Sequence, residues 1–186
     1  MRKAQSRGDA AMIKHIKTPL EEKTVKELHA GDIILLSGKI LVARDAAHKR
    51  MTDAMKSGEI LPFSIEKETI FYAGPAPTPP GAVIGPIGPT TSGRMDPYTP
   101  YLLEHGLCGM IGKGKRSAEV LKSIEDNGAV YFGATGGTAV LLSDSVVSAE
   151  TVAYEDLGPE AILRLEVKDM PLVVIADCHG ANLYDR

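Results

Sequence analysis

Short apolar runs alternate along the chain with glycine, proline and charged residues, and this pattern predicts strands and helices in turn. Runs rich in β-branched and aromatic residues favour strands. The expected strands cover residues 32–38, 39–44, 69–75, 82–85, 108–112, 129–134, 150–156, 162–168 and 171–177, and a Ser-Gly turn at 37–38 separates the first two.

Helix-starting and helix-ending residues place the helices between these strands. Thr18, Pro19 and Glu21 predict a helix start with a capping box, and Gly31 ends that helix. Asp45 is the expected cap of the next helix. Further helices are expected over 97–106, 117–128 and 135–143.

The order of these elements predicts one α/β domain with a mixed sheet. Strand and helix alternate from about residue 94 to 140, which is typical of a parallel βαβ unit. The earlier strand pair and the late strands favour additional antiparallel pairing. No internal repeat or domain linker divides the sequence.

Composition and charge exclude several classes of protein. The 186 residues are 44% apolar and 24% charged, which is typical of a globular chain, and the net charge of -3 argues against nucleic acid as the main partner. The longest apolar runs are far shorter than the roughly 20 residues that span a bilayer, so no membrane association is expected. Residues 1–16 are expected to form a flexible basic N-terminal extension, with an organelle transit peptide as the alternative.

Only two cysteines are present, Cys108 and Cys178, and they form no CxxC motif. A disulfide-rich scaffold is therefore excluded, and a reducing cytoplasm is the simplest compartment. Two cysteines also cannot supply the four ligands of a structural zinc site or the ligands of an iron–sulfur cluster.

The stretch ARDAAHKR, residues 43–50, lies where a strand ends and a helix begins. Arg44 is at the carboxyl end of the strand, where open α/β sheets build ligand sites, and the helix start favours an anion. The alternative is that Arg44 pairs with a surface carboxylate and that His48 is a solvated helix residue.

The stretch IGPTTSGRMDPY, residues 87–98, combines hydroxyls, glycines and an arginine. Thr90, Thr91 and Ser92 can donate hydrogen bonds to a carboxylate, and Arg94 offers the planar fork that binds a carboxylate through two nitrogens. An anion site at a helix start is one interpretation. Ordinary turn chemistry followed by a helix cap is the other.

The stretch GMIGKGKR, residues 109–116, nearly matches the phosphate-binding P-loop. That motif needs serine or threonine where this chain has Arg116. A nucleotide-binding module is thus an alternative, but Lys113 or Lys115 acting as a point charge toward an anion fits the sequence better.

Two further stretches favour structural roles. The glycine-rich residues 133–139 suit close strand–helix packing better than anion binding. The DCHG stretch at 177–180 resembles a catalytic dyad or metal cluster, but neighbouring side chains on an extended chain point apart. Neither stretch is expected to carry chemistry.

Three strand-end loops thus present Arg44, Arg94 and Lys113, with hydroxyls between them. If they converge, these cations suit a small molecule with more than one carboxylate. Three unrelated surface cations are the alternative.

The segments LLSGKILVARDAAHKR, GPTTSGRMD, IGKG and DCHGANLY resemble the β subunit, or C-terminal domain, of the iron–sulfur class I fumarases and L-tartrate dehydratases. The resemblance covers residues 17–186 and implies a swivelling β/β/α catalytic domain. It implies that this chain is half of a hydro-lyase, whose partner α subunit holds a [4Fe–4S] cluster on three cysteines with one iron open to substrate.

The resemblance also implies roles for single residues. It places the family's substrate-binding arginines at Arg44 and Arg94, its active-site lysine at Lys113, and its catalytic threonine at Thr90, beside the substrate-binding Thr91. The implied reaction is the reversible hydration of fumarate to (S)-malate.

Other positions bear on the choice of substrate. Within this resemblance, Gly93, Asp96 and the Ala46-Ala47 pair match the fumarase pattern, which implies fumarate, whereas DCHGANL is closer to the tartrate-type pattern. L-tartrate or another hydroxy-diacid is therefore the alternative substrate. A domain that only docks to and shields a partner, without catalysis, is a further alternative.

Overall fold

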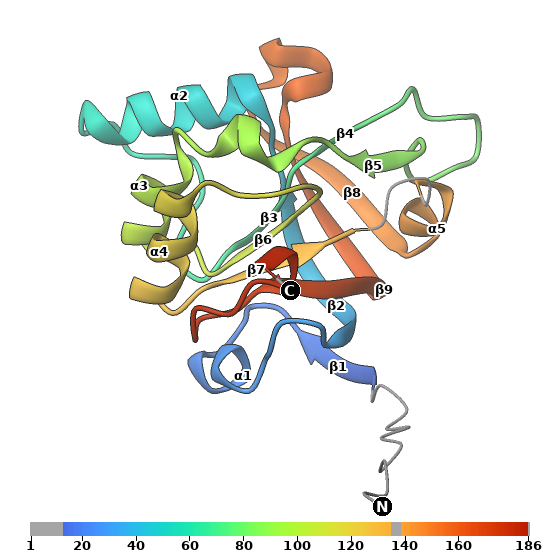
Figure 1. The fold of residues 1–186 in the computed structure, drawn as a ribbon. Coiled ribbons are helices and arrows are strands. Elements are labelled where there is room, and N and C mark those ends of the chain that lie inside the picture. Colours follow the sequence, from blue (N-terminus) through green and yellow to red (C-terminus); the bar gives the residue numbers. More distant parts are fainter. Residues whose placement is uncertain (1–12, 135–138, 186) are drawn as a thin grey trace, which may run out of the picture.

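Two long strands organise the sheet of the computed structural model, which describes residues 13–134 and 139–185 (Figure 1). Strand β2 spans Ile33–Val42 and strand β9 spans Ile162–Ala176, and the two pair antiparallel. The sheet has seven strands in the order β1-β2-β3-β6-β7-β9-β8. Because β2 also pairs with β9, the strands from β2 through β3, β6 and β7 to β9 close into a ring.

The parallel strands of this ring come from the middle of the chain. Strands β3 (Thr69–Phe71), β6 (Gly109–Gly112) and β7 (Val130–Gly133) run parallel to one another, and β3 runs parallel to β2. The predicted parallel βαβ unit is confirmed by β6, the helix α4 (Ala118–Asp126) and β7.

Helices cover one side of the sheet (Figure 1). Helix α2 spans Asp45–Lys56 and helix α3 spans Thr99–Glu104, beside α4, and the 3-10 helix η1 (Ser92–Met95) leads into α3. The remaining elements are α1 (Glu22–Lys26), α5 (Ala139–Asp144), β8 (Val146–Ala153), and the 3-10 helices η2 (Glu155–Glu160) and η3 (Leu183–Asp185). The predicted mixed α/β class is confirmed.

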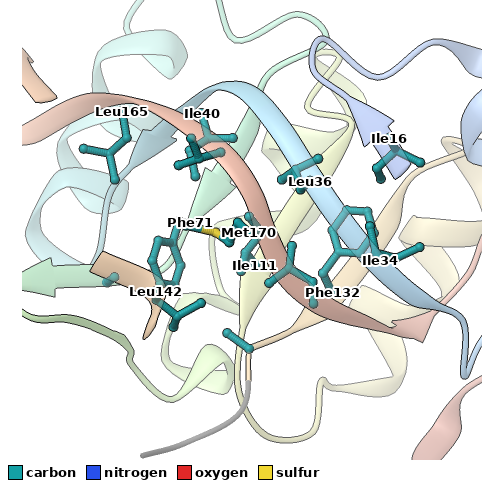
Figure 2. Close-up of a cluster of buried hydrophobic side chains, with 14 of the residues drawn as sticks. Ile16, Ile34, Leu36, Ile40, Phe71, Ile111, Phe132, Leu142, Leu165 and Met170 are labelled. Carbon is teal, nitrogen blue, oxygen red and sulfur yellow. The ribbon is translucent and has the colours of Figure 1, made fainter. Parts of the chain in front are cut away.

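The buried apolar side chains form two cores, one on each face of the sheet. One lies inside the ring of strands, where Ile40, Phe71, Ile111, Phe132 and Met170 are fully buried (Figure 2). The other packs the helices onto the outer face of β3, β6 and β7, through residues that include Met51, Ile70, Leu102, Met110 and Ile124. Burial of these side chains holds the strand ends, and the loops that follow them, in fixed positions.

Three predicted strand boundaries are wrong. The two strands expected within 32–44 are the single strand β2 (Ile33–Val42), because Ser37 and Gly38 make an irregularity within it instead of a turn. The two strands expected within 162–177 are likewise the single strand β9 (Ile162–Ala176). The expected strand at 69–75 divides into β3 and β4 (Ala73–Pro75), which belong to different sheets.

The proline- and glycine-rich passage also differs from expectation. No strand covers 82–85; the chain instead forms β5 (Ile87–Pro89), which pairs antiparallel with β4. Gly85 packs so closely on the Ala76 carbonyl oxygen that a side chain would lie 2.1 Å from it. Only glycine therefore fits at this position.

The N-terminal boundary shifts as well. Strand β1 spans Ile13–Lys17 and pairs parallel with β2, so residues 13–16 belong to the sheet rather than to the predicted extension. Residues 1–12 lie outside the described residues. Thr18 does not cap α1, because the helix begins at Glu22 and Glu21 takes the cap position. The Thr18 N–H instead donates to the Ser37 carbonyl and continues the sheet. Among the described residues, no helix is both long and apolar enough to cross a membrane.

Candidate functional site

Arg44 leaves the sheet at the end of β2 and takes the N-cap position of α2. Its Nε lies 3.3 Å from Asp45 Oδ2 and 3.6 Å from Glu160 Oε1. Glu160 Oε2 also accepts a hydrogen bond from the Ala46 N–H at 2.7 Å, so one carboxylate holds both the helix start and the arginine. The side chain of Arg44 crosses Gly74, where a Cβ would lie 3.3 Å from its Cδ and NH1.

Arg94, in the 3-10 helix η1, lies close to Arg44 although the two are far apart in the sequence. Its Nε lies 2.8 Å from Asp45 Oδ1, and its NH1 lies 3.5 Å from the Thr90 hydroxyl. Asp45 therefore pairs with Arg44 through one oxygen and with Arg94 through the other. The predicted convergence of these two arginines on one spot is what the structure shows. Asp45 is the first residue of α2, not its cap as predicted.

Thr91 and Lys113 join the third loop to this site. A parallel bridge connects the two residues, and the Ser92 N–H donates to the Lys113 carbonyl at 2.9 Å. Ser92 is fully buried, and its Oγ accepts from the Lys113 N–H at 3.0 Å. Ser92 therefore fixes the loop, while the partly exposed Thr90 and the exposed Thr91 remain available to a ligand.

The side chain of Lys113 is exposed, and it has no ion-pair partner among the residues that the structure describes. The neighbouring Lys115 differs, because its Nζ lies 5.8 Å from the centroid of the Tyr184 ring. Of these two lysines, Lys113 is therefore the one whose ammonium group has neither an ion-pair nor an aromatic partner among the described residues.

The near-P-loop is not built for a nucleotide. Its first glycine, Gly109, lies inside strand β6, whereas a phosphate-binding loop would begin after the strand. Arg116, which replaces the metal-binding hydroxyl, is buried and its Nε donates to Asp96 Oδ1 at 2.7 Å. Its guanidinium also lies against the rings of Tyr72 and Tyr131. The sequence alternative of a nucleotide-binding module therefore has no geometric support at this loop.

His48 is fully buried rather than solvated. Its Nδ1 lies 3.0 Å from the Arg44 carbonyl oxygen, and its ring packs edge-on against Tyr72 at a centroid distance of 5.1 Å. Burial lowers the pKa of His48 to about 4, and the nearby charge of Arg116 acts in the same direction. The neutral imidazole thus supports the backbone of Arg44.

The DCHG side chains do not point apart as predicted, because residues 178–180 form a turn and Cys178 Sγ lies 3.7 Å from His179 Nε2. The structural role expected of the stretch rests on Asp177. Buried Asp177 accepts hydrogen bonds from the backbone N–H groups of Ala30, His179 and Ala181. His179 Nε2 lies 2.9 Å from the Lys26 carbonyl oxygen, which ties this turn to α1. Of the other glycine-rich stretch, residues 135–138 lie outside the described residues.

Neither cysteine has the environment of a metal ligand. Burial raises the pKa of Cys108 to about 11, and it also raises the pKa of Cys178. Over residues 13–134 and 139–185, no group of three or more His, Cys, Asp or Glu side chains could hold a metal ion. The described residues therefore do not fit an iron–sulfur cluster within this chain.

Sequence reasoning missed Gly74 and Glu160, which both hold Arg44. Glu160 reaches the site from η2, and no local motif marks it. Gly74 sits next to Pro75 in a predicted strand, and an unexplained strand glycine was the available signal of close approach by another group.

Comparisons with known proteins place the chain in one sequence family. The family described as Fumarase C-terminus matches residues 2–186. The "Putative L(+)-tartrate dehydratase subunit beta" of Methanocaldococcus jannaschii is 42% identical over 173 residues, which cover 90% of this chain and 89% of that protein. "Fumarate hydratase 2" of Leishmania major is 36% identical over 175 residues, which cover 92% of this chain and 31% of that protein.

This chain also covers only about a third of a bacterial relative. "Fumarate hydratase class I, aerobic" of Escherichia coli is 38% identical over 190 residues, which cover 100% of this chain and 34% of that protein. The chain thus spans about a third of the length of the fumarate hydratases that it matches. With a family match over nearly all of its residues, this chain belongs to the fumarase C-terminus family.

Proposed function

We propose that this chain is the β-type half of a two-subunit hydro-lyase that interconverts fumarate and (S)-malate. The observation that carries the proposal is the convergence of Arg44 and Arg94 on one carboxylate, beside the Thr90 hydroxyl. Lys113 joins them through its bridge to Thr91. Two guanidinium groups and one ammonium group suit a ligand that carries two carboxylates.

Different side chains have different roles in the proposed reaction. Arg44, Thr91 and Lys113 bind the substrate carboxylates, and Arg94 holds the carboxylate next to the carbon that loses or gains a proton. As a proton leaves C3 of malate, negative charge builds on that carboxylate, and the fixed guanidinium stabilises it. Loss of hydroxide from C2 then gives fumarate, and the reverse sequence adds water across the double bond.

Thr90 is the residue that faces the transferred proton in this proposal. A threonine hydroxyl is a poor base in water, and the neighbouring Arg94 NH1 at 3.5 Å favours its deprotonated form only in a site that excludes water. Positioning the substrate for proton transfer is therefore the role that the geometry of Thr90 supports.

A partner completes the site. We propose that a cluster-bearing α subunit supplies the [4Fe–4S] cluster, since the described residues of this chain offer no ligand set for it. The name of the Methanocaldococcus relative, a subunit beta, supports a two-chain enzyme. In this proposal the domain, whose sheet begins at Ile13, acts as a swivelling domain that closes over the partner. The two free thiols favour the cytoplasm as compartment.

L-tartrate is the second candidate substrate. The relative named for L(+)-tartrate dehydratase is matched over 89% of its length, whereas the matched fumarate hydratases are about three times longer than this chain. The resemblance to fumarases at Gly93, Asp96 and the Ala46-Ala47 pair favours fumarate instead. A tartrate enzyme would use the same cations for two carboxylates that carry hydroxyls between them.

Anaerobic turnover tests the proposal. The loss of fumarate absorbance is followed with this chain alone and with a co-purified cluster-bearing partner, and L-tartrate is offered in parallel. Turnover of fumarate by the pair only, much faster than that of tartrate, is the expected result. Arg94→Ala should abolish turnover and leave the assembly intact, whereas a docking-only domain would be unaffected. An intact pair with a full cluster that turns over tartrate and not fumarate supports the second candidate.

A further inference from the structure

The two candidate substrate arginines share a single counter-ion. Asp45 Oδ2 lies 3.3 Å from Arg44 Nε, and Asp45 Oδ1 lies 2.8 Å from Arg94 Nε. Each oxygen of one carboxylate thus holds one guanidinium. The carboxylate is itself fixed, because Asp45 is the first residue of α2, where the positive end of the helix dipole favours a negative charge.

The ion pairs with Asp45 leave both arginines able to bind a ligand. Both are held through Nε, so the terminal nitrogens of each guanidinium remain for a ligand. Arg94 NH1 already lies 3.5 Å from the Thr90 hydroxyl, and Arg44 NH1 lies along Gly74. Without the carboxylate between them, the two positively charged guanidinium groups would repel each other, and the long arginine side chains would sample many rotamers.

We propose that Asp45 is a positioning residue that sets the separation and orientation of Arg44 and Arg94 for a dicarboxylate. The inference rests on the proposed function, since it concerns how the same site holds its substrate. Asp45 touches neither substrate nor reacting atoms in this account, and it acts through the two arginines. Glu160 supports Arg44 from the other side through its Oε1 at 3.6 Å.

A positioning role and simple stabilisation of the helix start predict different effects on kinetics. Asp45→Asn removes a negative charge from beside an anionic substrate, so ground-state attraction to the dicarboxylate is kept or strengthened. The arginines, however, lose their common anchor, and misplacement of about 1 Å can cost on the order of a hundredfold in rate. A positioning role therefore predicts that kcat falls while KM does not rise.

The test uses the complex with its cluster-bearing partner. Asp45→Asn is expected to lower kcat for fumarate about ten- to a hundredfold with KM unchanged or lower. Asp53→Asn is the matched control, because Asp53 lies on the same helix in an exposed pair with Lys49, and it should keep wild-type kcat and KM.

A second measurement does not depend on turnover. In the full chain alone, nuclear magnetic resonance follows the arginine Nε–H signals, assigned through Arg44→Lys and Arg94→Lys. Both signals should shift and exchange faster with water in Asp45→Asn and stay unchanged in Asp53→Asn. An inactive wild-type pair would count against the proposed function, while these signals would still decide the pairing.

Two outcomes overturn the inference. Nε–H signals that Asp45→Asn leaves unchanged would show that the carboxylate does not hold the arginines. An Asp45→Asn complex with wild-type kcat, or with raised KM and a lowered melting temperature, would show that Asp45 stabilises the helix and does not position the site.

Discussion

Arg116 Nε donates to Asp96 Oδ1 at 2.7 Å, and no part of the arginine side chain is exposed. The second oxygen of Asp96 accepts from the Ser117 N–H, and Arg116 NH2 donates to the Thr99 hydroxyl at 2.8 Å. The pair therefore ties the loop after β6 to the start of α3. Through it, the loop that carries Lys113 is held against the loop that carries Arg94.

Arg116→Met tests this tie. The substitution leaves Asp96 in a largely buried place without its cation, and removing one partner of a buried ion pair typically costs about 3–5 kcal/mol. Urea unfolding of the full chain should show a loss of that order in the free energy of unfolding. Arg50→Met is the matched control, because Arg50 pairs with Asp156 on the surface and packs on Tyr154. Equal losses in the two variants would contradict the structural role of Arg116.

His48 predicts a loss of stability in acid. Its pKa in the folded chain is about 4, below the usual value near 6.5, so the unfolded chain takes up this proton first as pH falls. The contribution is fully present above pH 6.5 and is lost between pH 6.5 and 4. One pKa unit corresponds to about 1.4 kcal/mol, so the loss over this window is on the order of 3 kcal/mol.

The measurement compares the free energy of unfolding of the wild type and of His48→Gln across this pH range. The variant lacks the buried titrating group, and its stability should fall less steeply in acid. His105→Gln removes an exposed histidine at the end of α3 and should keep the wild-type dependence. Parallel curves for wild type and His48→Gln would show that other groups cause the acid loss.

Lys113 and Lys115 should differ sharply in the proposed complex with a cluster-bearing partner. Lys113→Ala removes the uncommitted charge beside Thr91 and should lower kcat/KM for the dicarboxylate about a hundredfold, as does loss of one donor to a developing charge. Lys115→Ala removes a lysine that packs near Tyr184 and should leave kcat/KM close to wild type. Similar losses in both variants would indicate a general electrostatic effect instead of a specific contact.

Gly74→Ala should disturb Arg44 without unfolding the chain. The added Cβ would lie 3.3 Å from Arg44 Cδ and NH1, which is tight enough to push the guanidinium aside. We expect several-fold lower kcat/KM at an unchanged melting temperature. Gly88→Ala is the matched control, because Gly88 pairs with Gly74 across the two strands and its Cβ would meet Ala139 instead. A larger kinetic effect at Gly88 than at Gly74 would contradict the assignment.

Local patterns predicted the elements whose signals are local. Helices α2 and α4, and the parallel pair β6 and β7, were predictable because periodicity, caps and flanking glycines lie within each segment. That β2 is one continuous strand was not predictable, because a glycine such as Gly38 is typical of a turn. Its φ of +114° serves an irregularity instead, where a Cβ would lie 2.4 Å from the Thr18 hydroxyl.

The site divides in the same way. Arg44, Arg94 and Lys113 could be selected because each follows a strand in a loop rich in glycine or hydroxyl residues. Glu160 could not, because its contact with Arg44 depends on where η2 lies in the folded chain. Ser92 looked like a ligand group, but burial assigns its hydroxyl to the backbone of Lys113.

The triple pairing of β9 with β2, β7 and β8 has a consequence for biosynthesis. The ribosome releases β2, β3, β6 and β7 before it releases Ile162–Ala176, the strand that joins both ends of that series. At about 5–20 residues per second, the nascent chain spends several seconds with two open strand edges and an uncovered apolar interior. Ring closure is then a late event, and chaperones that shield unpaired edges have their window during that interval.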